Sequence, residues 1–203
     1  DIKDTLPMAL RNVRQLYIAE GQKYAHMTYF FNGGYSNPVG GEDRITIPSI
    51  SLKHFEEKPE MCAGKITNTV LKKLKAKKYD FIALNYANPD MVGHTGNVDA
   101  AIKGIEFTDQ CIGKVVKEIH KQKGTVLITA DHGNAEDMVN LKTGEVDTKH
   151  SSNPVPFIIV SSDKRVLRKK NLPEGVLGNV APTILDIMKI DKPGNMKLKS
   201  LLK

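Results

Sequence analysis

Short apolar runs alternate with longer segments of helical period in this chain, and that alternation limits the folds open to it. An apolar run over 80–86 is followed by a helical pattern over 98–121 and a second apolar run over 125–130. Short apolar runs bounded by turn signals are typical of strands buried on both faces, and a strand, a helix and a strand in succession form a βαβ unit. The pattern therefore predicts an α/β fold, with a largely parallel sheet and helices on both faces.

The rest of the chain adds elements of the same two kinds. The expected elements are helices over 8–19, 59–78 and 180–188, strands over 26–31 and 156–160, and a long Pro- and Gly-containing loop over 35–58. A loop of that length is uncommon in a compact domain unless it is functional. The length of 203 residues suits one domain with a buried core.

Composition excludes several classes of protein. No apolar run approaches the roughly 20 residues that a membrane span needs, and the start of the chain at 1–4 lacks the basic-then-apolar order of a signal peptide. Cys62 and Cys111 show no CxxC spacing, so a reducing compartment is the simpler assumption. We therefore expect a soluble, cytoplasmic protein with no membrane partner.

The formal charge of +7 raises the question of a polyanionic partner. The lysines gather over 72–78 and 164–170, and no aromatic residues interleave with them as a surface for single-stranded nucleic acid would need. A solvated basic face is the better interpretation, since cations are favoured near helix C-termini in any case. We expect no nucleic-acid partner, and a small anionic substrate fits the charge equally well.

Acidic residues and histidines follow two of the predicted strands. Asp90 and His94 come after the strand that ends near 86, and Asp131 and His132 come directly after the strand that ends at 130. In open α/β sheets, ligands bind outside the carboxyl ends of the strands. These two pairs are therefore expected to converge on one crevice.

The spacing of these residues suits metal ligands. Asp90 and His94 are four residues apart, so a carboxylate oxygen and an imidazole nitrogen can reach the same cation. Asp131 and His132 are adjacent, and a bend at the strand end would let them bind one ion or two ions a few ångströms apart. His150, in the loop before the third strand, offers a further nitrogen. Any one of these residues alone would more often cap a turn, but together at successive strand ends they favour a metal site.

Mixed nitrogen and oxygen ligands suit Mn²⁺, Zn²⁺ or a similar first-row ion better than Ca²⁺, and the absence of thiolate argues against structural zinc. Two metals about 4 Å apart serve phosphoryl transfer, because they activate an oxygen nucleophile and neutralise charge on the phosphoryl oxygens. The residues thus predict a two-metal phosphoryl-transfer site. His26, His54 and His120 do not belong to such a group of residues at a strand end, and we expect them to pack in the fold or face solvent.

Several stretches resemble one family in its own order along nearly the whole chain. They are Lys23-Tyr-Ala-His26, Thr28-Tyr-Phe-Phe-Asn-Gly-Gly34, Pro59-Glu-Met61, Asn85-Tyr-Ala-Asn-Pro-Asp-Met-Val-Gly-His-Thr-Gly96, Thr129-Ala-Asp-His-Gly-Asn-Ala-Glu136 and His150-Ser-Ser-Asn-Pro-Val-Pro156. The family is that of the cofactor-independent (2,3-bisphosphoglycerate-independent) phosphoglycerate mutases, members of the alkaline phosphatase superfamily. The resemblance implies an alkaline-phosphatase-like fold.

The resemblance also implies roles for the site residues. One metal, usually Mn²⁺, is implied to be bound by Asp90, His94 and His150, and a second by Asp131 and His132 with ligands from elsewhere. The resemblance implies that Lys23 contacts the phosphoryl group or the nucleophile. In this family a serine takes the phosphoryl group from 3-phosphoglycerate and returns it to give 2-phosphoglycerate, in a monomeric enzyme of glycolysis and gluconeogenesis.

The chain lacks parts that the family needs. The nucleophilic serine in its Ser-Glu-x-Gly-His context, a further metal-ligating Asp and the inserted transferase domain have no counterpart in this sequence. We therefore interpret residues 1–203 as the C-terminal part of the phosphatase domain, an incomplete fold that is inactive alone. The alternatives are another phosphomutase or phosphohydrolase of the superfamily, such as a phosphopentomutase, and a non-catalytic module that binds metal or a partner.

Overall fold

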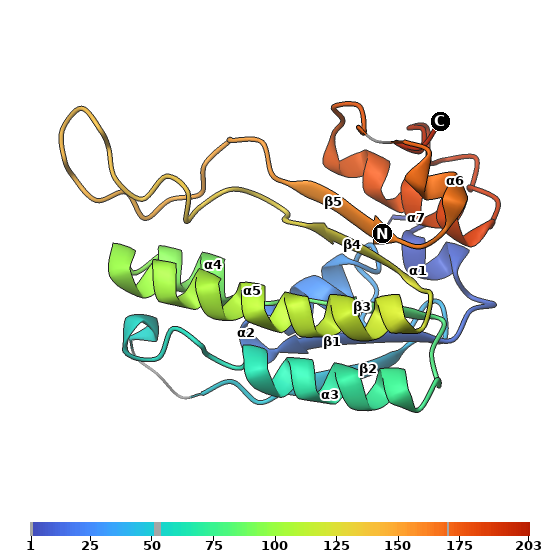
Figure 1. Cartoon of the computed structure of the whole chain (residues 1–203), viewed down its shortest axis with the longest axis horizontal. Helices are drawn as coiled ribbons and strands as arrows, with labels where there is room; N and C mark the ends of the chain where they lie inside the picture. The colour runs from blue at the N-terminus through green and yellow to red at the C-terminus, as the bar shows by residue number, and fades with distance from the viewer. Residues whose placement is uncertain (1, 51–53, 170) are drawn as a thin grey trace.

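The strands form two sheets in the computed structural model, which describes residues 2–50, 54–169 and 171–203. The first sheet has the order β2-β1-β3 with all strands parallel, and the second pairs β4 with β5 antiparallel (Figure 1). The strands are β1 (Gln15–Glu20), β2 (Asp43–Ile47), β3 (Phe81–Leu84), β4 (Thr125–Thr129) and β5 (Phe157–Ser161). The α/β class predicted from the sequence is confirmed.

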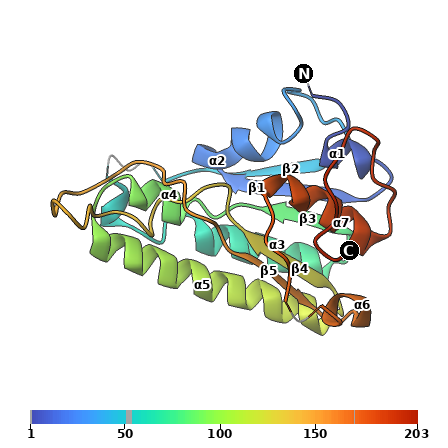
Figure 2. The ribbon, with the colours of Figure 1, turned by 90° about the horizontal axis from the view of Figure 1, so that it is seen from above.

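Helices connect and cover these strands. The α-helices are α1 (Leu6–Ala9), α2 (Gly21–Ala25), α3 (Ala63–Lys75), α4 (Asn88–Gly93), α5 (Val98–Lys121), α6 (Lys164–Leu167) and α7 (Val180–Met188). A π-helix (His26–Phe30) extends α2, and short 3₁₀ helices lie at Phe55–Glu57 and Leu177–Asn179. Figure 2 shows α2 on one side of the parallel sheet and α3 with α5 on the other.

Apolar side chains on both faces of the parallel sheet hold the layers together. On one face, Ile66 and Val70 of α3 and Val115 of α5 pack around Ile18 of β1, with the partly buried Ile82 beside them. Side chains alternate between faces along a strand, so its neighbour Phe81 turns the other way. Phe81 packs against a second cluster that contains residues of α1 and α7.

Two predicted elements near the start of the chain are wrong. The helix expected over 8–19 is only the short α1, followed by β1. All six residues of β1 are buried, including the polar Gln15 and Glu20, so the strand has neither a polar–apolar alternation nor an uninterrupted apolar run to reveal it. The Gln15 amide donates to the carbonyls of Pro7 and Leu10, at 3.2 and 2.8 Å, and is thereby accommodated in the core.

The strand expected over 26–31 is helical instead. Thr28 donates its side-chain hydroxyl to the backbone carbonyl oxygen of Tyr24, one turn earlier in the helix, at 2.8 Å. The β-prone residue types at 26–31 were therefore overridden by the continuation of α2. The loop expected over 35–58 contains β2 and the helix Phe55–Glu57, while its residues 51–53 lie outside the described residues.

The strand, helix and strand of the predicted βαβ unit are present as β3, α5 and β4, but the two strands lie in different sheets, so the unit itself is not formed. Within the described ranges, β3 pairs with β1 alone and β4 with β5 alone, so each leaves one edge without a strand partner. Neither β3 nor β4 contains a charged side chain, whereas the edge strand β2 contains Asp43 and Arg44. The third predicted strand, β5, is antiparallel to β4 because the long connection between them forms a loop and brings the chain back.

Among the described helices, none combines the length and the apolar character that crossing a membrane requires.

Glu42 provides a test of the packing beside β2. Glu42 is 4% exposed, and its carboxylate accepts hydrogen bonds from Asn32 Nδ2 (2.9 Å), Arg44 Nη2 (2.8 Å) and the backbone N–H of Gly40 (2.9 Å). Burial alone would raise the pKa of Glu42, but these hydrogen bonds outweigh it and hold the pKa below its usual value. The ionised carboxylate thus stabilises the fold.

Glu42→Gln is expected to lower the free energy of unfolding at pH 7 by about 1–3 kcal/mol, because a charged acceptor is lost. Since the pKa is lowered on folding, the contribution of Glu42 is fully present above the unfolded pKa of about 4.3 and is lost as the pH falls from there through the lower folded pKa. In urea unfolding, acidification should therefore lower the free energy of unfolding of Glu42→Gln by less than it lowers that of wild type. Equal pH dependence of wild type and variant would contradict this, and Glu174→Gln, at an exposed position, is the control.

Candidate metal centre

The predicted site residues lie at the carboxyl ends of three strands. Lys23 is in α2, which begins directly after β1, and Asp90 is in α4, which follows β3. Asp131 and His132 follow the end of β4, and His150 lies in the long connection between β4 and β5. Figure 1 shows this connection extending past the end of the molecule where α4 lies. These residues thus lie where the sequence predicted them, beyond the ends of the strands.

The local sequence explains how α4 presents its side chains. Pro89 lies in the first turn of the helix, where its missing N–H costs nothing. Asp90 and His94 are one turn apart, so their side chains share one face, and Asp90 Oδ1 lies 3.1 Å from His94 Nε2.

The Asp90 carboxylate is the centre of the cluster. Its Oδ2 accepts a hydrogen bond from Lys23 Nζ at 2.5 Å. Its Oδ1 lies 3.1 Å from His150 Nε2 and accepts a hydrogen bond from Asn134 Nδ2 at 2.9 Å. The carboxylate therefore divides its two oxygens, one toward the lysine and one toward the histidines and Asn134.

Charge keeps Asp90 ionised. Burial by itself would raise the pKa of Asp90, but the hydrogen bonds from Lys23 and Asn134 and the positive charge of Lys23 lower it to about 2. The Asp90 side chain is 15% exposed and that of Lys23 is 10% exposed, so water screens this ion pair only partly. An ionised, half-enclosed carboxylate is the form that binds a cation.

The two histidines around Asp90 are oriented by their contacts. His94 Nδ1 lies 2.7 Å from the carbonyl oxygen of Thr148. Because a carbonyl oxygen only accepts, Nδ1 carries the hydrogen, which leaves the lone pair of a neutral ring on Nε2. That Nε2 lies 3.0 Å from Nε2 of His150. Asp90, His94 and His150, which the resemblance assigns to one metal, therefore present their donor atoms to one another.

His132 joins the same cluster. Its ring stacks on that of His150, with 3.7 Å between the centroids and 25° between the planes. One ligand atom each of Asp90, His132 and His150 lies within 4.8 Å of the other two. Asp131 Oδ2 is 3.5 Å from His132 Nε2, and its side chain is 62% exposed. The two ligand sets expected from the sequence are thus contiguous.

This donor set fits divalent first-row metal ions. It offers carboxylate oxygen and imidazole nitrogen without thiolate, and an orienting backbone carbonyl backs His94, as is common for metal-binding histidines.

Sequence reasoning assigned no role to two residues next to the site. Asn134 is 4% exposed and donates to Asp90, and Glu136 accepts from the backbone N–H of Asn134 at 2.8 Å. Both lie in the stretch that resembles the mutases, but neither has a ligand-like spacing. Their contacts arise from the packing of the loop after β4 against α4, which no spacing along the sequence reveals.

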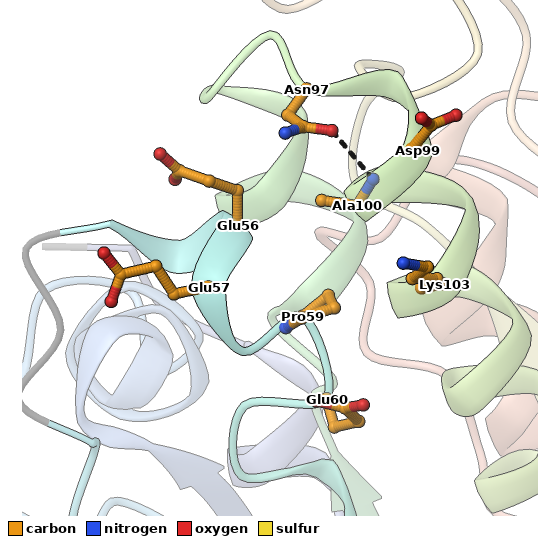
Figure 3. Close-up of a pocket in the computed structure, with 8 residues that line it drawn as sticks. All are labelled: Glu56, Glu57, Pro59, Glu60, Asn97, Asp99, Ala100 and Lys103. Atoms are coloured by element: carbon orange, nitrogen blue, oxygen red, sulfur yellow. Dashed lines mark hydrogen bonds between the residues drawn. The ribbon is translucent and has the colours of Figure 1, made fainter.

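A separate pocket of about 440 Å³ lies between the helix Phe55–Glu57 and the start of α5 (Figure 3). Its lining residues are Glu56, Glu57, Pro59, Glu60, Asn97, Asp99, Ala100 and Lys103. None of them belongs to the predicted metal site. Because carboxylates predominate, the pocket does not suit an anionic ligand.

Gly93 tests how tightly α4 and Asn134 fit together. A Cβ atom at Gly93 would lie 2.5 Å from Asn134 Oδ1. Gly93→Ala is therefore expected to displace the buried amide and to lower the free energy of unfolding by about 1–3 kcal/mol in urea titrations. The matched control is Gly113→Ala in α5, where a Cβ would meet nothing within 4 Å. That substitution should stabilise the chain by about 0.4–1 kcal/mol. Equal stabilisation by both changes would rule out the tight fit.

Comparison with known proteins identifies the family of the chain. Residues 2–192 match the family described as the Metalloenzyme superfamily. The chain is 52% identical to the 2,3-bisphosphoglycerate-independent phosphoglycerate mutase of Clostridium kluyveri, over 93% of this chain and 36% of the relative. The corresponding values for the mutase of Clostridioides difficile are 50%, 96% and 38%. The chain therefore spans little more than a third of the length of these curated relatives.

A solved structure shows the same architecture. The phosphoglycerate mutase of Leishmania mexicana, crystallised at low cobalt concentration, superposes with a TM-score of 0.87 at 32% sequence identity. The match covers 96% of this chain and 38% of that chain. The resemblance drawn from the motifs is confirmed, and the match over residues 2–192 shows that the chain belongs to the Metalloenzyme superfamily.

Proposed function

We propose that this chain is the C-terminal, metal-binding part of the phosphatase domain of a 2,3-bisphosphoglycerate-independent phosphoglycerate mutase. The complete enzyme would interconvert 3-phosphoglycerate and 2-phosphoglycerate in the cytoplasm, as a step of glycolysis and gluconeogenesis. The observation that carries the proposal is the convergence of Asp90, His94 and His150, whose donor atoms approach within 3.0–3.1 Å. The identity of about half to named mutases supports the choice of reaction.

The two ligand sets are assigned to two metal ions, and we propose Mn²⁺ for both. Asp90, His94 and His150 would hold one ion, and Asp131 with His132 would contribute to the other. Bound divalent ions supply activation of an oxygen nucleophile and neutralisation of phosphoryl charge. The stacking of His132 on His150 supports the placement of the two ions side by side.

Lys23 is assigned to the phosphoryl group. Its Nζ is held beside Asp90 and the side chain is largely buried, so the charge is positioned before any substrate binds. An anionic phosphoryl group beside this ammonium would offset the positive charge that metal ions add to the site. The chain contributes no residue to which we assign the role of nucleophile.

Metal titration tests the ligand assignment. Mn²⁺ binding, followed by electron paramagnetic resonance of free Mn²⁺, is expected to weaken at least 10-fold in Asp90→Asn, because a charged ligand becomes a neutral amide. Asp99→Asn, at an exposed position in the first turn of α5, should bind as wild type does. Unchanged binding in Asp90→Asn would remove Asp90 from the ligand set.

Turnover tests the interpretation of the chain as one part of an enzyme. Purified chain supplied with Mn²⁺ and 3-phosphoglycerate is expected to form no 2-phosphoglycerate above background in an enolase-coupled assay, because no nucleophile is assigned within it. Robust conversion by pure material, lost in His94→Asn, would show that the chain holds a complete active site.

A further inference from the structure

Glu136 lies outside the proposed ligand set, yet hydrogen bonds occupy both of its carboxylate oxygens. Oε2 accepts from the backbone N–H of Asn134 at 2.8 Å. Oε1 accepts from the hydroxyl of Ser151 and from Asn153 Nδ2, the latter at 3.1 Å. The residue is exposed, so these contacts do not serve to satisfy a buried charge.

The contacts of Glu136 join two loops that are distant in sequence. Asn134 is in the loop after β4, and Ser151 and Asn153 are in the loop before β5. The backbone adds one hydrogen bond between the loops, from Ser151 N–H to the carbonyl oxygen of Gly133 at 2.9 Å. A Cβ atom at Gly133 would lie 2.2 Å from Glu136 Oε1 and from Ser151 Oγ, so glycine permits this close crossing.

These hydrogen bonds connect the two loops to Asp90 in a closed network of contacts around the candidate metal site. Asn134 donates its backbone N–H to Glu136 and its side-chain amide to Asp90. Ser151 follows His150 in the chain, and His150 Nε2 returns to Asp90 at 3.1 Å. The side chain of Glu136 bonds both to the loop after β4 and to the loop before β5.

We propose that Glu136 is a positioning residue that holds the loop of His132 and the loop of His150 together, so that both imidazoles converge on Asp90. The inference rests on the proposed function in that His132 and His150 are taken as metal ligands. Both oxygens of Glu136 are already engaged, so the residue acts through the loops and contributes no ligand atom. Supporting hydrogen bonds of this kind typically change metal affinity by about 10- to 100-fold.

The test compares Glu136→Ala and Glu136→Gln with Asp137→Asn in the 203-residue chain. Asp137 is the exposed neighbour of Glu136, and its substitution removes the same charge from the same loop. Two properties are measured: the affinity for Mn²⁺, and the ring-proton NMR shifts of His132 and His150 in metal-free protein. Stacked rings shift each other's signals, so the second measurement reports the geometry of the loops without metal.

Glu136→Ala is expected to lower Mn²⁺ affinity by about 10- to 100-fold and to move the two histidine signals toward those of isolated rings. Glu136→Gln should recover part of both losses, because its carbonyl oxygen still accepts from Ser151 and Asn153. If Glu136 were instead a metal ligand, its replacement by glutamine would not restore the ring signals of the metal-free protein. Asp137→Asn should match wild type within about 2-fold. Ser151→Ala, which removes the opposite partner, should reproduce the effect of Glu136→Ala.

Failure of the proposal and failure of the proposed function give different results. If Glu136→Ala leaves the histidine signals in place, or leaves the Mn²⁺ affinity of a metal-binding wild type unchanged, Glu136 does not position the ligands. If the wild type binds no Mn²⁺ while the signals still move in Glu136→Ala, the metal assignment fails and the role of Glu136 in holding the loops stands.

Discussion

The carboxylate of Asp90 joins segments that lie far apart in the sequence. It takes hydrogen bonds or close polar contacts from α2, from the loop after β4 and from the loop before β5, while its own helix follows β3. A carboxylate as enclosed as this one would destabilise the fold if its partners were missing, because a buried charge without compensation is costly. The loops around the site are therefore ordered by the same group that is proposed to bind metal.

The division of the Asp90 oxygens keeps the lysine apart from the histidines. Oδ2 faces the ammonium of Lys23 and Oδ1 faces the imidazoles. The lysine is therefore held near the candidate metal site but at the opposite oxygen. This arrangement lets one carboxylate serve a fixed cation and an exchangeable one, with Asn134 fixing the orientation of the group. The helix α4 supplies the geometry, since one turn of helix sets Asp90 beside His94.

Sequence patterns were sufficient where a helix has a strong period of its own or a strand is a continuous apolar run. The helices over 98–121 and 180–188 and the apolar strands near 81–84, 125–129 and 157–161 were predicted close to their observed bounds. Sequence patterns failed for β1, whose every residue is buried, and for the π-helix over 26–30, whose residue types favour strands. Both depend on tertiary packing, which local propensity does not encode.

The candidate site shows the same division. Residue types and their positions after strands pointed to Asp90, His94, Asp131, His132 and His150, which the structure brings into one cluster. The resemblance added Lys23. Asn134 and Glu136 were missed as contributors because their contacts cross between loops, and no spacing along the chain reveals such a crossing.

The split between the two sheets has a consequence for how the chain behaves in solution. Within the described residues, β3 and β4 each leave an edge without a strand partner, and neither contains a charge that would repel another strand. Unpaired backbone groups beside apolar side chains are a template for strand addition. A concentrated preparation of this chain is therefore disposed to intermolecular β-pairing. Its tendency to aggregate would come from the uncharged edges at β3 and β4 rather than from the charged edge at β2.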